Sequence, residues 1–124
     1  MTQQEKQLLL IVFCEMLQYG VQYKDAHGYK KTLDIWSPEF HTALNTILYD
    51  GKPSLYLRPM SSMTEEEAEE YNDLVNELSN YDCQPEQSAS KMIDWLNKHN
   101  FDYRGLIKLG LAIEAPKDMY KINN

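Results

Sequence analysis

Three histidines are the residues of this chain best suited to acid–base or nucleophilic chemistry. His27 lies in a turn-forming run, His41 follows the break at residues 37–39, and His99 falls at the end of an expected helix. Nucleophilic catalysis needs a hydroxyl or thiol beside a base that a carboxylate orients. Motifs typical of that arrangement, such as a nucleophile elbow, are absent. We therefore predict no catalytic residue and no enzyme, and the sign of an enzyme would be a buried pocket holding a histidine next to a carboxylate or thiol.

A metal site is the second chemistry that these residue types allow. His99, Asp102 and Cys83 have suitable donor atoms, but their spacing matches no metal motif. His99 at a helix end and Asp102 as a helix cap explain both residues without a metal. We predict no metal and no cofactor. Cys14 and Cys83 have no paired spacing, so we expect free thiols in a reducing compartment.

The acidic residues are the third candidate, because the net charge of −7 is unevenly placed. Residues 64–87 contain nine Asp or Glu and no Lys or Arg. Calcium binding is disfavoured, since helical side chains do not fold around an ion as an EF-hand loop does. Two interpretations stay open: a solvated face, or an acidic surface that docks on a basic partner or imitates nucleic-acid charge. The predicted docking face consists of Glu65, Glu66, Glu69, Glu70 and Asp73.

The C-terminal third combines basic and aromatic residues, which is typical of nucleic-acid binding. Its excess of positive charge is only two, far below the basic stripe that such domains show. We therefore expect no nucleic-acid contact, and keep a nucleic-acid-binding regulator as the alternative function. The residues concerned are Lys91, Lys98, Arg104, Lys108, Lys117 and Lys121 with Trp95, Phe101, Tyr103 and Tyr120.

The first element that the sequence predicts is an apolar N-terminal helix over residues 3–18. Thr2 and Glu5 form a capping-box pattern, and Gly20 suits a left-handed end. Its apolar residues point nearly all the way round, so the helix is either covered on two sides within the domain or buries a face in a second copy. The predicted oligomer face consists of Leu9, Val12, Phe13 and Met16.

A small antiparallel sheet of two or three strands is expected next. Strands are predicted at about residues 21–24, 29–36 and 45–49, with a turn at Asp25 to Gly28 between the first two. Residues 40–44 are either a loop or one helical turn. The fold class is α+β, as a single domain over residues 1–124.

Three helices are predicted after the sheet. They cover about residues 65–80, 89–99 and 103–109, with a loop over 80–87 and a short edge strand near 111–113. Thr64 and Glu67 form a second capping box. Asp102 is expected to cap the last helix and Gly110 to close it in a Schellman motif. The tail from residue 117 onward is expected to be loosely held, with Met119 and Tyr120 as the residues able to pin it.

No membrane contact is predicted. The apolar run from Leu8 to Cys14 is too short for a span and makes a poor secretory core. We therefore expect a soluble, cytoplasmic protein.

Two stretches carry a resemblance to a known family. Residues 56–67 read YLRPMSSMTEEE, and residues 94–107 read DWLNKHNFDYRGLI, continuing with GLAIEAP at 110–116 and Met119-Tyr120. They resemble a family of short proteins of uncharacterised activity from gut bacteria and their prophages and other mobile elements. Residues 14–21 match more loosely and lack the family's arginine and proline. The resemblance implies a mobile-element context and no particular chemistry.

These observations favour a non-enzymatic accessory protein related to mobile elements that works by binding another protein or itself, for example as a homodimer.

Overall fold

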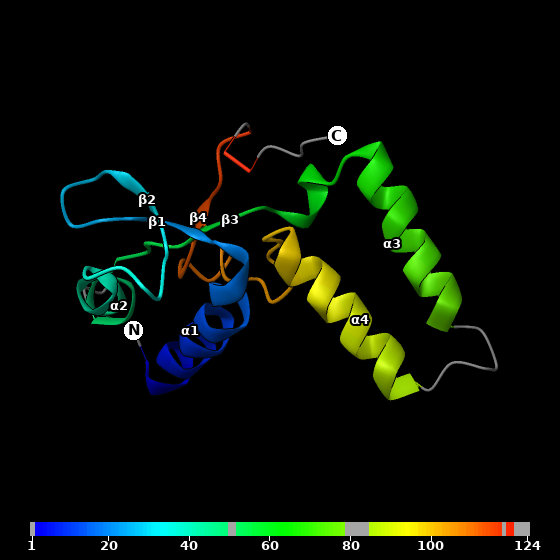
Figure 1. Ribbon diagram of the computed structural model, residues 1–124, viewed down its shortest axis with the longest axis horizontal. Coiled ribbons are helices and arrows are strands. Elements are labelled where there is room, and N and C mark those ends of the chain that lie inside the picture. Colours follow the sequence, from blue (N-terminus) through cyan, green and yellow to red (C-terminus); the bar gives the residue numbers. More distant parts are fainter. Residues whose placement is uncertain (1, 50–51, 79–84, 118, 121–124) are drawn as a thin grey trace.

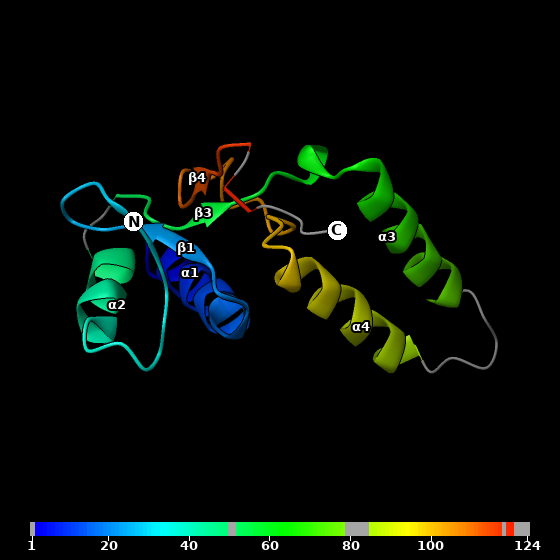
Figure 2. The ribbon, with the colours of Figure 1, turned by 45° about the horizontal axis from the view of Figure 1, so that its top comes forward.

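The computed structural model describes residues 2–49, 52–78, 85–117 and 119–120, and it has an α+β fold (Figure 1). Two views agree that α3 and α4 lie side by side on one side of the molecule, while α1, α2 and the paired strands β1 and β2 lie on the other (Figures 1 and 2). In chain order the elements are α1 (Gln3–Met16), the 3-10 helix η1 (Leu17–Tyr19), β1 (Gln22–Lys24), β2 (Lys30–Thr32), α2 (Phe40–Tyr49), β3 (Tyr56–Leu57), the 3-10 helix η2 (Met60–Ser62), α3 (Glu65–Leu78), α4 (Pro85–Lys98) and β4 (Ile113–Glu114).

Several predicted starts and ends of elements are confirmed. Thr2 and Glu5 form the capping box of α1, and each accepts a hydrogen bond from the other's backbone N–H. Gly20 ends η1 with a φ of 74°. The turn between β1 and β2 closes through the N–H of Gly28, which donates to the Asp25 carbonyl at 3.0 Å. Local capping and turn chemistry thus sets the ends of these segments.

The strands form two small pairs. β1 and β2 are antiparallel, with Tyr23 opposite Lys31, whereas β3 and β4 are parallel, with Tyr56 opposite Ile113. A bridge between Tyr23 and Leu55 links the two pairs. The Tyr120 hydroxyl lies across the same junction. It accepts from the Gln22 N–H and donates to the Tyr56 carbonyl, both at 2.7 Å, so Tyr120 is fixed to the body at this point.

The predicted oligomer face of α1 is wrong as an exposed surface. Its four residues are between 1% and 3% exposed and belong to the central apolar cluster of the chain. The solvent side of α1 carries Leu10 and Ile11 instead. The sequence pattern could not show which side of α1 is buried, because apolar residues occur on both sides. No helix within the described part of the chain is long and apolar enough to cross a membrane.

The central apolar cluster joins α1, α2, β1, β3 and the segment before β4. No residue of α3 or α4 is among its described members. We call the part that shares this cluster the body, and α3 with α4 the hairpin. The members are Leu9, Val12, Phe13, Met16, Val21, Tyr23, Leu33, Ala43, Ile47, Leu48, Leu55, Leu57, Leu106, Leu111 and Ala112.

The strand predicted at 45–49 is wrong, because these residues form the second half of α2. Ala43, Ile47 and Leu48 are buried at spacings of four and five, and Thr46 bonds back to the Thr42 carbonyl at 3.0 Å. Residues 40–44, for which a loop and one helical turn were both open, form the first half of the same helix. β2 covers only Lys30–Thr32 of the predicted strand at 29–36.

The helix predicted at 103–109 is also wrong. Gly105 has a φ of 77°, which interrupts a right-handed helix, and a turn follows over residues 106–110. The expected Schellman end is nevertheless confirmed there, because Leu111 N–H donates to the Leu106 carbonyl at 2.8 Å and Gly110 N–H to the Ile107 carbonyl at 3.1 Å.

The predicted loop at 80–87 is too long, because α4 begins at Pro85, a residue that fits the first turn of a helix. The remainder of that loop, residues 80–84, lies outside the described residues, as does the end of the helix predicted to reach residue 80. The edge strand is confirmed as β4, slightly later than expected.

Candidate functional site

Arg58 is the point at which the body meets the hairpin. It follows β3, and its backbone pairs with the chain after α4. The Arg58 N–H donates to the Asn100 carbonyl at 2.8 Å, and the Asp102 N–H donates to the Arg58 carbonyl at 2.7 Å. Pro59 has no N–H to continue the strand pairing, and the chain passes from it into η2 and then α3. Arg58 is thus fixed by backbone bonds before its side chain makes any contact.

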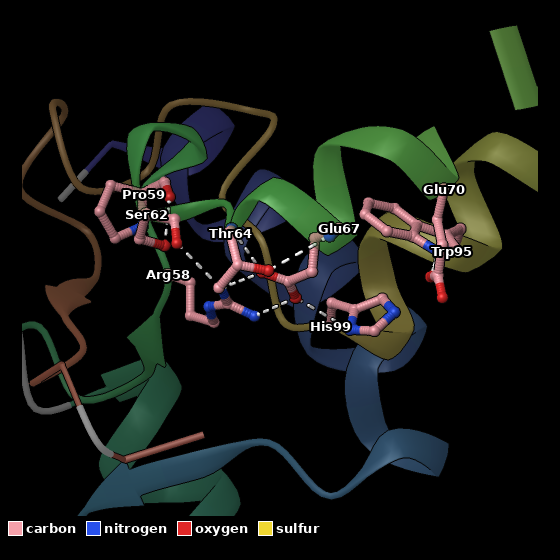
Figure 3. Close-up of polar contacts among 8 residues, drawn as sticks. All are labelled: Arg58, Pro59, Ser62, Thr64, Glu67, Glu70, Trp95 and His99. Atoms are coloured by element: carbon pink, nitrogen blue, oxygen red, sulfur yellow. Dashed lines mark hydrogen bonds and ion pairs between the residues drawn. The ribbon is translucent and has the colours of Figure 1, made fainter. Parts of the chain in front are cut away.

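The side chain of Arg58 forms a buried ion pair with Glu67 of α3 (Figure 3). Its two terminal nitrogens donate to the two Glu67 oxygens at 2.8 and 2.7 Å. The Thr64 N–H donates to Glu67 Oε1 at 2.9 Å as part of the capping box. His99, after the end of α4, places Nδ1 at 3.3 Å from Glu67 Oε2. Arg58, Glu67 and His99, which we call the anchor cluster, therefore connect three separate segments.

The surroundings of the anchor cluster lower the pKa of both Glu67 and His99. Burial would raise the pKa of Glu67, but the Arg58 guanidinium, the Thr64 N–H and His99 outweigh it and lower that pKa below its usual value. Burial lowers the pKa of His99, and the nearby Glu67 and Glu70 only partly oppose that effect. At neutral pH the cluster is therefore a charged Arg–Glu pair beside a neutral histidine.

Aromatic side chains continue the anchor cluster into the hairpin. The Arg58 guanidinium lies over the Phe101 ring at 4.2 Å from its centroid. Phe101 stacks on Trp95 at 5.8 Å, and Trp95 contacts Tyr71 of α3 at 5.5 Å. Cation–π and aromatic contacts of this kind each contribute roughly 0.5–1.5 kcal/mol beyond burial. The stack therefore holds α3 against α4 and both against Arg58.

The anchor cluster contains the sign that we associated with an enzyme, a histidine next to a carboxylate. Both oxygens of that carboxylate already accept from Arg58, and Glu67 is only 3% exposed. A carboxylate with all these donors has little capacity left to take a proton from a substrate. The geometry fits a structural ion cluster.

A second polar contact ties α1 to the chain after α4. Glu15 accepts from the Tyr103 hydroxyl and from Arg104 Nη2, both at 2.7 Å. The same hydroxyl lies 3.0 Å from Asn97 Oδ1 of α4, and Asn97 is buried. Polar side chains thus hold the hairpin here as well.

Four of the five residues of the predicted acidic docking face lie on the side of α3 away from α4, and the fifth, Glu70, lies at the edge next to α4. Ala68, Tyr71 and Leu74 are partly buried, and helical spacing puts the four carboxylates on the other side. All five predicted residues are exposed: Glu65, Glu66, Glu69, Glu70 and Asp73. Glu70 differs from the others because Oε2 accepts from Trp95 Nε1 at 3.0 Å. The capping box at Thr64 thus turns the Glu67 side chain into the interior, while the neighbouring carboxylates stay exposed.

The residues considered for a metal are separated by their structural roles. Asp102 accepts from the N–H groups of Leu106 and Ile107 at 2.8 and 2.9 Å, so it caps the turn rather than a helix. His99 belongs to the anchor cluster, and Cys83 lies outside the described residues. Within the described ranges, no three His, Cys, Asp or Glu side chains are placed to hold a metal ion. Cys14 is exposed on α1 with a free thiol.

The residues of the nucleic-acid alternative are largely engaged within the chain. Phe101 is fully buried, Trp95 is stacked, and the Tyr103 and Tyr120 hydroxyls are hydrogen bonded. Arg104 pairs with Glu15. Base stacking needs free aromatic faces beside cations. The four aromatic residues of this C-terminal set do not present that combination.

No family model, no curated protein and no solved structure matches this chain.

Sequence reasoning missed the Arg58–Glu67 pair. One signal was present, because Glu67 occupies the capping-box position, where a side chain turns back toward the preceding segment. The partner could not be found, since the position of Arg58 depends on backbone pairing with Asn100 and Asp102, about forty residues further along the chain.

Proposed function

We propose that this protein is a non-enzymatic accessory protein of a mobile element that binds a basic surface of another protein through the exposed face of α3. One observation carries the proposal. α3 contains seven carboxylates and no Lys or Arg, and among the described residues Glu67 is the one that forms a buried ion pair. The mobile-element context is supported by the resemblance of residues 56–67, 94–107, 110–116 and 119–120 to a family from gut bacteria and their prophages and other mobile elements.

The geometry supports a docking role because the face is both charged and held in place. Among the described residues, Glu65, Glu66, Glu69 and Asp73 form no ion pair, and Glu77 meets Lys91 only at 4.0 Å between exposed groups. Repulsion among these closely spaced carboxylates raises the electrostatic energy of the free protein, and binding of a cationic partner lowers it. Val75 and Ile93 add exposed apolar area on the hairpin. A Lys- and Arg-rich protein surface fits this combination.

The test compares capture of partners by three forms of the chain in its host. The first is the unaltered protein, and the second carries Glu66→Gln and Glu69→Gln. The matched control carries Asp94→Asn and Glu114→Gln, which removes two exposed carboxylates that are not on α3. We expect a basic protein to be retained by the first and third forms, lost from the second, and released by salt. Equal retention by all three forms, or recovery of nucleic acid alone, would contradict the proposal.

A further inference from the structure

A hollow of about 340 Å³ lies between the β1–β2 turn and the segment that leads from α2 to β3. This volume is near the lower end of the range for small-molecule sites. Its walls include Lys24 from β1 and Lys52 and Ser54 from the segment before β3, with Thr46 from α2. The Lys24 N–H donates to the Ser54 carbonyl at 2.8 Å, so two walls of the hollow are fixed to each other. The site is therefore built by the body and is separate from the hairpin.

The hollow is positive in a chain whose net charge is negative. Among the described residues, no carboxylate lies within ion-pair distance of Lys24 or Lys52. Asp25 is also in the wall, but it lies 3.3 Å from the Lys31 ammonium and accepts from the N–H groups of His27 and Tyr29 at 2.9 and 2.8 Å. Lys31 is shared with Glu39, whose Oε2 lies 3.0 Å from the same ammonium, so Asp25 is only partly compensated and the two lysines of the wall still leave the hollow with an excess of positive charge. Two lysines in one concave site favour an anionic group.

The remaining wall offers hydroxyl groups. Ser54 and Thr46 are both buried. The Ser54 hydroxyl donates to the Lys52 carbonyl at 3.4 Å, a long bond that a better acceptor can replace. The Thr46 hydroxyl donates to Thr42 and keeps its lone pairs to accept from a ligand hydroxyl. The polar groups thus match a ligand with an anionic end and a hydroxylated body.

We propose that this hollow binds a small hydroxylated molecule that carries one phosphate or carboxylate group. Lys24 and Lys52 contact the anionic group, while Ser54 and Thr46 contact the hydroxylated part. The proposal does not depend on the function of the acidic face, because no residue is shared between the two.

The test is a titration followed by amide NMR at constant ionic strength, with inorganic phosphate, acetate and glycerol 3-phosphate as probes. We expect saturable shifts at the amides of residues 24–28, 46, 52 and 54, with glycerol 3-phosphate binding more tightly than inorganic phosphate. A phosphate ligand predicts weaker binding of acetate than of inorganic phosphate, and a carboxylate ligand predicts the reverse.

The variants make the result specific to the hollow. Lys24→Gln with Lys52→Gln should weaken binding about tenfold or more, whereas the control Lys108→Gln with Lys117→Gln should leave it unchanged. Ser54→Ala should remove the preference for glycerol 3-phosphate over inorganic phosphate. Shifts spread over all lysines without saturation, or equal affinity in the two double variants, would overturn the proposal.

Discussion

The body and the hairpin are held by different forces. The body shares one apolar cluster to which α1, α2, β1 and β3 contribute, whereas no described residue of α3 or α4 belongs to it. The hairpin is attached through the Arg58–Glu67 pair, the aromatic stack and the contacts of Glu15. Apolar burial tolerates small displacements, while a bidentate ion pair requires one geometry. The polar attachment therefore fixes the orientation of α3, and with it the direction in which the acidic face points.

The largest expected effect follows from breaking the anchor cluster. Arg58→Met leaves Glu67 buried without its partner, which should destabilise the hairpin by about 4 kcal/mol. The measurement is urea unfolding monitored by Trp95 fluorescence, in a background where the exposed Trp36 is replaced by Phe.

The control is the double variant Arg58→Met with Glu67→Gln, which removes the uncompensated charge and keeps the capping bond. We expect it to be more stable than Arg58→Met alone. A single variant that unfolds at the same urea concentration as the unaltered protein would show that the pair does not hold the hairpin.

The next effect tests the apolar side of the comparison with two neighbours on α1. Leu9 is 2% exposed and Leu10 is 43% exposed. Leu9→Ala should lower the free energy of unfolding by about 3 kcal/mol, and Leu10→Ala by less than about 1 kcal/mol. Thermal or urea unfolding of the two variants provides the measurement. Similar losses in both would mean that Leu10 is covered as well, as in a homodimer through the other side of α1.

A smaller effect is expected where α4 ends. Asn100 has a φ of 59°, and Phe101 N–H donates to the Leu96 carbonyl at 3.0 Å, which is a Schellman end with asparagine in the left-handed position. Asn100→Ala should cost about 1 kcal/mol because alanine disfavours this conformation. Asn100→Gly should cost less, because glycine adopts a positive φ freely and because Asn100 Oδ1 has no hydrogen-bond partner to lose among the described residues. Chemical denaturation of the two variants would contradict this if alanine were the better tolerated.

The smallest effect above pH 5 is expected from titration of His99. Its folded pKa lies below the ordinary value of 6.5, so the unfolded chain binds more protons as the pH falls through 6.5, and acid favours unfolding. Glu67 adds a second loss below its ordinary value of 4.5, because its folded pKa is lowered. Unfolding followed at Trp95 should show both losses. His99→Gln should remove the first, and stability that rises between pH 7 and 5 would contradict the assignment.

Local signals in the sequence predicted the ends of elements better than their partners. The capping boxes at Thr2 and Thr64, the turn at Asp25 and the Schellman end at Gly110 each depend on residues within about five positions of one another. Such contacts are readable from spacing alone. The exposure of the acidic residues on α3 was predicted from the same kind of local signal, the capping box and the helical spacing.

Predictions failed where distant packing decides. The β-branched Thr46 and Ile47 favour a strand by propensity, but burial of Ala43 and Ile47 on one side makes the segment a helix. On α1, both Leu9 and Leu10 are apolar, and only the position of the rest of the body determines which is buried. The Arg58–Glu67 pair depends on pairing between residue 58 and residues 100–102. None of these long-range contacts has a local signature.

The most direct test of the account is native-state hydrogen exchange of the α1 and α3 amides. We predict that α3 amides exchange through an opening of lower free energy than α1 amides, because no described residue of α3 belongs to the apolar cluster. Arg58→Met should accelerate exchange in α3 and α4 while leaving α1 nearly unchanged. Equal opening free energies for α1 and α3, or an equal acceleration of both by Arg58→Met, would contradict a hairpin that is held by its polar attachment.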